Sequence, residues 1–190
     1  KKNISMPKFR SITDKNAKVL YLETNALGSA LLTTAKLNKG TAFTESERQQ
    51  LGLRGKLPYS IESLQQQEQR VYQQFLKKEN NLEKHLYLRS LHNTNEVLFY
   101  KLVSQHLTEM LPILYTPTVG KAVEQFSHEF QQPRGLYIAY PNRDHIDEIL
   151  ENRLNSEVDI IVMTDGEGVL GIGDQGIGGM DICIVKLMVY

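Results

Sequence analysis

A helix that is apolar on almost every side closes this chain of 190 residues. The segment GMDICIVKLMVY, residues 179–190, carries aliphatic side chains at helical intervals on more than one face. A helix of this kind belongs inside a protein rather than on its surface. The fold therefore has to enclose this segment.

Lys186 is unexpected in such a helix. A lysine there can extend its ammonium group outward to water, pair with an acid, or lose its proton at neutral pH. The third alternative matters for chemistry, because desolvation can lower the pKa of a lysine to about 7–8 and make it a general base. From the helix alone, outward extension or pairing is the favoured interpretation.

A glycine string, GIGDQG at residues 171–176, precedes this helix and matches the dinucleotide fingerprint G-x-G-x-x-G. Asp174 weakens the match, because a carboxylate in the loop would repel a pyrophosphate. The acidic residue that holds a ribose hydroxyl, about 20 positions further on, would also lie beyond Tyr190. The sequence favours glycines that serve tight turns and close helix packing, and we predict no cofactor-binding residue here.

The sequence before residue 130 is dominated by helical periodicity. Residues 1–43 predict extended and irregular structure with one short helix near 26–33. Thr44 and Glu47 then form a capping box before a short helix that Gly52 ends. Longer helices are predicted over 61–80, 82–92, 95–111 and 118–130.

The sequence after residue 130 alternates between strand and helix signals. Strands are predicted at 135–140 and 158–165, around a polar helix at 142–154, and this order is typical of an α/β unit. The fold class we expect is α/β, with a mainly helical region over 1–130 and the beginning of an α/β domain over 131–190. The last helix stops at Tyr190 without a cap, so we expect the chain to be part of a longer protein.

Composition excludes several classes of function. The 22 basic and 22 acidic residues cancel, which argues against a nucleic-acid partner. No apolar run reaches the ~18 residues of a membrane span, and no signal core follows the N-terminus, so we expect a cytoplasmic protein. One cysteine and five histidines that never fall four residues apart leave no zinc-type or helical metal pair, so we predict no metal ligand in this chain.

Several stretches together resemble the malic enzyme family. The resemblance covers roughly residues 37–190, and the pairing of LNKGTAFT with YTPTVG is too long to be chance. The stretches that carry it are LNKGTAFTESERQQLGLRGKLP (37–58), NEVLFYKL (95–102), LPILYTPTVG (111–120), PRGLYI (133–138) and TDGEGVLGIGDQGIGGM (164–180).

The resemblance implies an enzyme that oxidises L-malate with NAD or NADP and Mn or Mg, and releases carbon dioxide and pyruvate. The family's substrate-facing tyrosine and lysine correspond to Tyr115 and Lys186. The lysine would take the hydroxyl proton of malate, and the tyrosine would protonate the enolpyruvate carbon. The resemblance also implies a homodimer or homotetramer, a glycine string on the substrate side, and metal ligands outside this chain, so Asp165, Glu167 and Asp174 are not assigned that role.

Departures from the family pattern leave a second chemistry open. The family commonly has an arginine for the substrate carboxylate where this chain has Gly168, which we therefore take as the substrate-binding position. Gly168 and Asp181 are closer to malolactic enzymes, relatives that turn malate into lactate. An activator site of some relatives is matched at Arg70 but has Thr94 in place of its second arginine. The remaining alternative is a non-catalytic helical dimerisation module.

Overall fold

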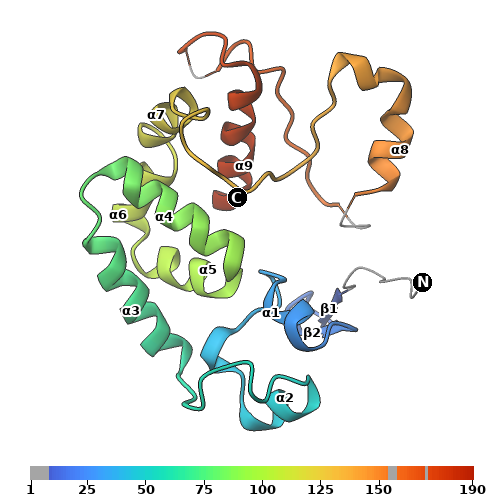
Figure 1. Cartoon of the computed structure of the whole chain (residues 1–190), viewed down its shortest axis with the longest axis vertical. Coiled ribbons are helices and arrows are strands. Elements are labelled where there is room, and N and C mark those ends of the chain that lie inside the picture. The colour runs from blue at the N-terminus through green and yellow to red at the C-terminus, as the bar shows by residue number, and fades with distance from the viewer. Residues whose placement is uncertain (1–8, 154–157, 170) are drawn as a thin grey trace. The chain divides into compact units, whose positions relative to one another are not determined.

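The chain folds into two compact units, Lys1–Met110 and Leu111–Tyr190, in a computed structural model that describes residues 9–153, 158–169 and 171–190. It is mainly helical, with one small two-stranded sheet (Figure 1). The expected mainly helical first part is confirmed. The expected domain boundary near residue 130 stays a prediction.

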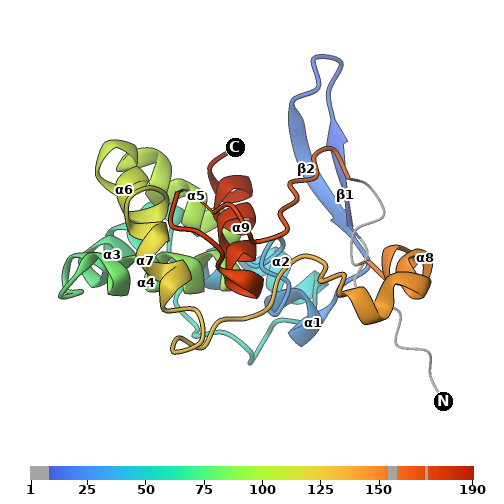
Figure 2. The ribbon, with the colours of Figure 1, turned by 90° about the horizontal axis from the view of Figure 1, so that it is seen from above.

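The first unit begins with an antiparallel hairpin of β1 (Phe9–Thr13) and β2 (Val19–Thr24), a narrow blue ribbon in Figure 2. Asp14 builds its turn, because one carboxylate oxygen accepts from the amides of Asn16 at 2.8 Å and Lys18 at 2.9 Å. The sequence predicted extended structure here but not the hairpin.

A small apolar core lies beside the hairpin. It is formed around α1 (Gly28–Leu32), η1 (Gly40–Ala42) and α2 (Glu45–Gln50), and Phe9 and Leu22 of the hairpin pack against it. The predicted capping box of α2 is present, with the Thr44 and Glu47 side chains each accepting from the other's amide. The buried members of this core are Ala26, Leu31, Leu37, Phe43 and Leu53.

Arg48 of α2 fixes the segment that leads to the next helix. Its guanidinium is 4% exposed and donates to the carbonyls of Pro58 at 2.7 Å and Phe43 at 2.9 Å, with three further carbonyl contacts. A planar fork with five N–H donors suits this role. The segment therefore reaches the N-terminus of α3 in a fixed conformation.

Three helices complete the first unit, α3 (Leu64–Leu76), α4 (Asn81–Thr94) and α5 (Glu96–Gln105), and they pack on one another (Figure 1). Phe75, Leu88 and Phe99 are fully buried on their facing sides. The helix predicted over 95–111 is wrong in one respect, because it breaks at His106 into α5 and α6 (Leu107–Leu114).

The second unit contains α7 (Thr118–Glu124), η2 (Tyr140–His145), α8 (Ile146–Glu151), η3 (Gly176–Gly179) and α9 (Met180–Val189). The final helix is confirmed, and α7 packs on α9. The helix predicted over 118–130 is shorter than expected, and so is the one predicted over 142–154 within its described residues, since residue 154 lies outside them.

The two strand predictions in this unit are wrong, since the described residues of 135–140 and 158–165 form no strand. A strand needs a neighbour for its backbone N–H and C=O groups, and the described part of this unit offers none. Ile160 and Ile161 are accordingly 62% and 73% exposed. Among the described residues, no helix has the length and apolar character needed to cross a membrane.

Candidate functional site

Tyr115 follows α6 directly and is half-buried in the second unit. Its amide donates to the Leu111 carbonyl and its carbonyl accepts from the Val119 amide, both at 2.8 Å. The Thr118 hydroxyl donates to the Pro112 carbonyl at 2.8 Å, which closes the same turn. The backbone of Tyr115 is therefore held by helical bonds on both sides, and its phenol makes no hydrogen bond within the described residues.

Lys186 lies in the middle of α9 and is half-buried, so the sequence-based picture of a buried lysine needs correction. Its ammonium lies 5.9 Å from the centroid of the Tyr190 ring, one helical turn further on. In the described part of the chain it has no carboxylate at ion-pair distance. Of the three alternatives, the structure comes nearest to outward extension, with Lys186 half-buried and its ammonium near the Tyr190 ring.

Cys183 shares this helix with Lys186 and is 4% exposed. Burial raises the pKa of the Cys183 thiol, and the nearby Lys186 ammonium opposes part of that rise. The thiol is therefore a weakly reactive group in the folded chain, and its reactivity reports on how α9 is seated.

Gly168 lies in an exposed turn between Glu167 and the buried Val169. A Cβ built on Gly168 has no neighbour within 4 Å, and its backbone lies outside the left-handed region. The position can therefore accept a side chain without strain, although it carries none here.

Close backbone packing joins the segments that carry these residues. A Cβ on Gly166, in the turn before Gly168, would overlap the Gly176 carbonyl, and the Gly166 carbonyl accepts from the Gln175 amide at 2.8 Å. A Cβ on Gly179, at the start of α9, would lie 2.8 Å from the Gly166 Cα. The structure thus brings the Gly168 turn onto the helix of Lys186, and α7, which follows Tyr115, onto the same helix.

The glycine string uses its glycines for turns and contacts. Gly171 and Gly173 have φ values of 76° and 86°, which favour glycine, and an added Cβ would meet open space at both. The amides of Gly176 and Gly178 already donate, to Asp174 Oδ1 at 2.8 Å and to the Gln175 carbonyl at 3.1 Å. A phosphate would therefore compete with existing acceptors at the start of α9, and the residues present do not fit a pyrophosphate site.

No metal centre can be built from the residues that the structure describes, because no three His, Cys, Asp or Glu side chains converge. The acidic groups of this region serve turns instead. Asp165 Oδ1 accepts from the Glu167 amide at 3.1 Å, as Asp174 does from Gly176.

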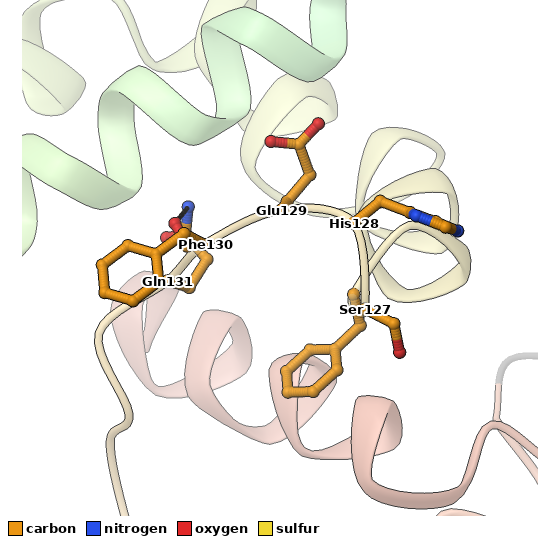
Figure 3. A pocket seen from close by; sticks show the side chains of 6 residues that line it. Ser127, His128, Glu129, Phe130 and Gln131 are labelled. Atoms are coloured by element: carbon orange, nitrogen blue, oxygen red, sulfur yellow. Dashed lines mark hydrogen bonds between the residues drawn. The ribbon is translucent and has the colours of Figure 1, made fainter.

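A hollow of about 380 Å³ lies inside the loop from Phe126 to Gln131 (Figure 3). The run Ser127, His128 and Glu129 contains the residue types of a nucleophile, a base and an acid. Figure 3 shows their side chains pointing in different directions, away from one another. The hollow therefore holds no catalytic arrangement, and Phe130 beside it is 96% exposed.

A polar cluster that the sequence did not predict lies in the first unit. Glu68, 3% exposed, accepts from His106 Nε2 and from Gln65 Nε2, both at 3.0 Å. The Tyr72 ring stacks on His106 with centroids 3.7 Å apart, and its hydroxyl donates to Glu109 at 3.0 Å. No sequence signal could have found the pair, since 38 positions separate Glu68 from His106.

The residues matched to an activator site make contacts within the chain. Arg70 pairs with the Glu62 carboxylate. The Thr94 hydroxyl donates to carbonyls of its own helix, those of Ser90 at 3.0 Å and Leu91 at 3.1 Å. The second position therefore supplies no positive charge for a dicarboxylate.

Comparison of the sequence with known proteins shows the class of protein to which this chain belongs. The family described as malic enzyme, N-terminal domain, matches residues 92–190. The chain belongs to the malic enzyme family.

Individual relatives agree with this membership. The chain is 55% identical over 163 residues to an NAD-dependent malic enzyme of Aeromonas hydrophila, covering 86% of this chain and 29% of the relative. It is 52% identical over 177 residues to one of Shewanella piezotolerans, covering 93% and 31%, and 54% identical over 163 residues to one of Vibrio parahaemolyticus, covering 86% and 29%. The chain thus spans 29–31% of the length of these relatives.

Proposed function

We propose that the full-length protein oxidatively decarboxylates L-malate to pyruvate and carbon dioxide with NAD, in the cytoplasm and as a homodimer or homotetramer. The observation that carries the proposal is the family membership of a chain that keeps both Tyr115 and Lys186. The relatives are named NAD-dependent, which favours NAD over NADP. L-malate is accordingly the proposed small-molecule partner.

Two residues of this chain carry the proposed proton transfers. Lys186 in its uncharged form takes the proton of the C2 hydroxyl while C2 gives up its hydride, so malate becomes oxaloacetate. NAD, when bound, supplies the hydride acceptor. Oxaloacetate then loses carbon dioxide, and the Tyr115 phenol donates a proton to C3 of the resulting enolpyruvate, which gives pyruvate. Transfers of this kind typically contribute 10²- to 10⁴-fold in rate.

The geometry is compatible with these roles. Tyr115 is fixed by backbone bonds on both sides, so its phenol starts from a rigid turn. The Lys186 side chain has no carboxylate at ion-pair distance within the described residues, so no ion pair holds it in its charged form. Both residues belong to the second unit, where α7 packs on α9.

NAD and Mn or Mg are proposed to be held by parts of the full-length protein other than the residues described here. The described residues form no metal cluster, and the amides at the start of α9 are already engaged. We therefore expect the 190-residue chain alone to bind neither NAD nor NADP and to have no malate-dependent activity. Calorimetric titration with each dinucleotide checks this, and micromolar binding would contradict it.

A malolactic reaction is the second candidate, because Gly168 and Asp181 depart from the pattern of malic enzymes. The experiment that separates the two is incubation of the full-length enzyme with L-malate, NAD and manganese. Oxidative decarboxylation yields pyruvate with an equal amount of NADH. Lactate without net NADH would overturn the first proposal in favour of the second.

A further inference from the structure

The start of α9 touches two other segments through two consecutive glycines. Gly179 has an ordinary helical φ of −58°, so its backbone would allow alanine. A Cβ there would nevertheless lie 2.8 Å from the Gly166 Cα and 3.0 Å from Val169 Cγ2. The first of these neighbours is backbone and cannot rotate away, so the contact itself requires glycine.

Gly178 makes the corresponding contact on another side. Its Cβ would lie 3.2 Å from the Val123 carbonyl oxygen and 3.3 Å from the Phe126 Cβ. Val123 belongs to α7, which begins three residues after Tyr115. These distances are tight but leave room for a small shift, so alanine at Gly178 is the milder change.

The two glycines therefore allow α9 to pack closely on the segments that carry Gly168 and Tyr115. Gly179 meets the turn that leads to Gly168, and Gly178 meets the helix that follows Tyr115. Lys186 follows Gly179 by seven residues on the same helix, or about 10 Å at 1.5 Å per residue. A displacement at the start of α9 is thus passed along a rigid helix to the lysine.

We propose that Gly178 and Gly179 are positioning residues of the malate reaction. Because neither has a side chain, the start of α9 can lie close to the neighbouring segments, and this fixes the position of Lys186 relative to the Tyr115 and Gly168 segments. This assignment rests on the proposed function. It gives the two glycines that follow the string a role in substrate geometry. A misplacement of about 1 Å in a catalytic geometry can cost 10²-fold in rate.

The test compares Gly179→Ala and Gly178→Ala with Gly120→Ala in the full-length enzyme. Gly120 lies in α7, and a Cβ there meets nothing within 4 Å, so this control carries the same substitution without the contact. We expect kcat/KM for malate, measured well below each melting temperature, to fall roughly 10- to 100-fold in Gly179→Ala and less in Gly178→Ala. Gly120→Ala is expected to keep the wild-type value.

A merely structural role gives a different result. The melting temperature of Gly179→Ala would then fall while kcat/KM of the folded enzyme stays at the wild-type value, and this outcome would overturn the proposal. Gly178→Ala serves the same comparison where Gly179→Ala does not fold.

A second readout needs no enzymatic activity. The rate at which iodoacetamide alkylates Cys183, buried on α9, should rise at least several-fold in Gly179→Ala and stay unchanged in Gly120→Ala. If the wild-type enzyme fails to reduce NAD with malate, the proposed function is wrong. The alkylation rate of Cys183 then still tests whether Gly179 fixes the packing of α9 on its neighbours. Unchanged Cys183 protection in Gly179→Ala would refute the positioning role in either case.

Discussion

Glu68 and His106 are held side by side across 38 positions of sequence, with a hydrogen bond of 3.0 Å from His106 Nε2 to the buried carboxylate. The pair attaches α3 to the residue at which α5 ends and α6 begins. The amide of His106 shares its bond between the Leu102 and Val103 carbonyls, both at 3.2 Å, as the helix breaks. The polar contact and the break therefore coincide.

His106→Ala is expected to lower the free energy of unfolding by about 1–3 kcal/mol, because the buried Glu68 carboxylate loses a donor and Tyr72 loses its stacking partner. Urea denaturation followed by circular dichroism measures the change. The matched control is His145→Ala, since His145 pairs with Glu148 at 3.5 Å but both side chains are mostly exposed. A change within about 0.5 kcal/mol is expected there, and equal losses in the two variants would contradict the argument.

Local sequence signals predicted the helices well but not their interruptions. The capping box of Thr44 and Glu47 lies within four residues and could be recognised directly. The break at His106 coincides with a contact to Glu68 in a distant helix, which periodicity cannot show, so the predicted helix ran through it. The strand predicted at 158–165 failed for the same kind of reason, because a strand exists only with a neighbour to pair with.

The candidate site residues were chosen by resemblance more than by pattern, and their roles stay predictions. The helix of Lys186 is where the sequence predicted it, but the burial of Lys186 was overestimated, since its side chain lies along the helix near the Tyr190 ring. The contact of Gly179 with Gly166 could not be predicted, because close approach of two backbones leaves no mark beyond the glycines themselves. Glycines that serve turns, such as Gly171, look identical in the sequence.

The stability of the chain is expected to fall at alkaline pH through Tyr87. Burial raises the pKa of Tyr87 to about 12, and its hydroxyl donates to Gln74 Oε1 at 2.9 Å. The phenol of a tyrosine in an unfolded chain has a pKa of about 10. The folded state therefore favours the neutral phenol of Tyr87. The resulting contribution to the free energy of unfolding is complete below about pH 10 and is lost as the pH rises to about 12. Urea midpoints of wild type and Tyr87→Phe across this range should show the dependence weakened in the variant. Tyr59→Phe, at a position 96% exposed, should retain it.

Lys186→Ala and Tyr115→Phe should each lower kcat of the full-length enzyme roughly 10²- to 10⁴-fold with the fold retained, the range of a lost general base or acid. Malate deuterated at C2 distinguishes the steps. The deuterium isotope effect should grow in Lys186→Ala, where hydride transfer is slowed, and shrink in Tyr115→Phe, where the later protonation limits the rate. Lys121→Ala, which removes an exposed lysine of α7, is the control and should stay near wild type. Wild-type activity with an unchanged pH profile in Lys186→Ala would make that lysine merely structural.

Gly168→Arg should be accepted by the fold, because a side chain there leaves into open space from an ordinary backbone conformation. We expect the free energy of unfolding to change by no more than about 0.5 kcal/mol. If position 168 faces the substrate carboxylate, as the resemblance implies, a guanidinium there adds a charge-assisted hydrogen bond worth about 1.5–3 kcal/mol, and KM for malate should fall roughly tenfold or more. Gly168→Ala fills the position without charge and should leave KM unchanged.

The products of Gly168→Arg and wild type decide between the two chemistries. If wild type forms pyruvate and NADH, the arginine alters affinity alone. If wild type instead forms lactate and Gly168→Arg diverts the enzyme to pyruvate and NADH, the glycine is what retains pyruvate for reduction, and the malolactic assignment replaces the one favoured here.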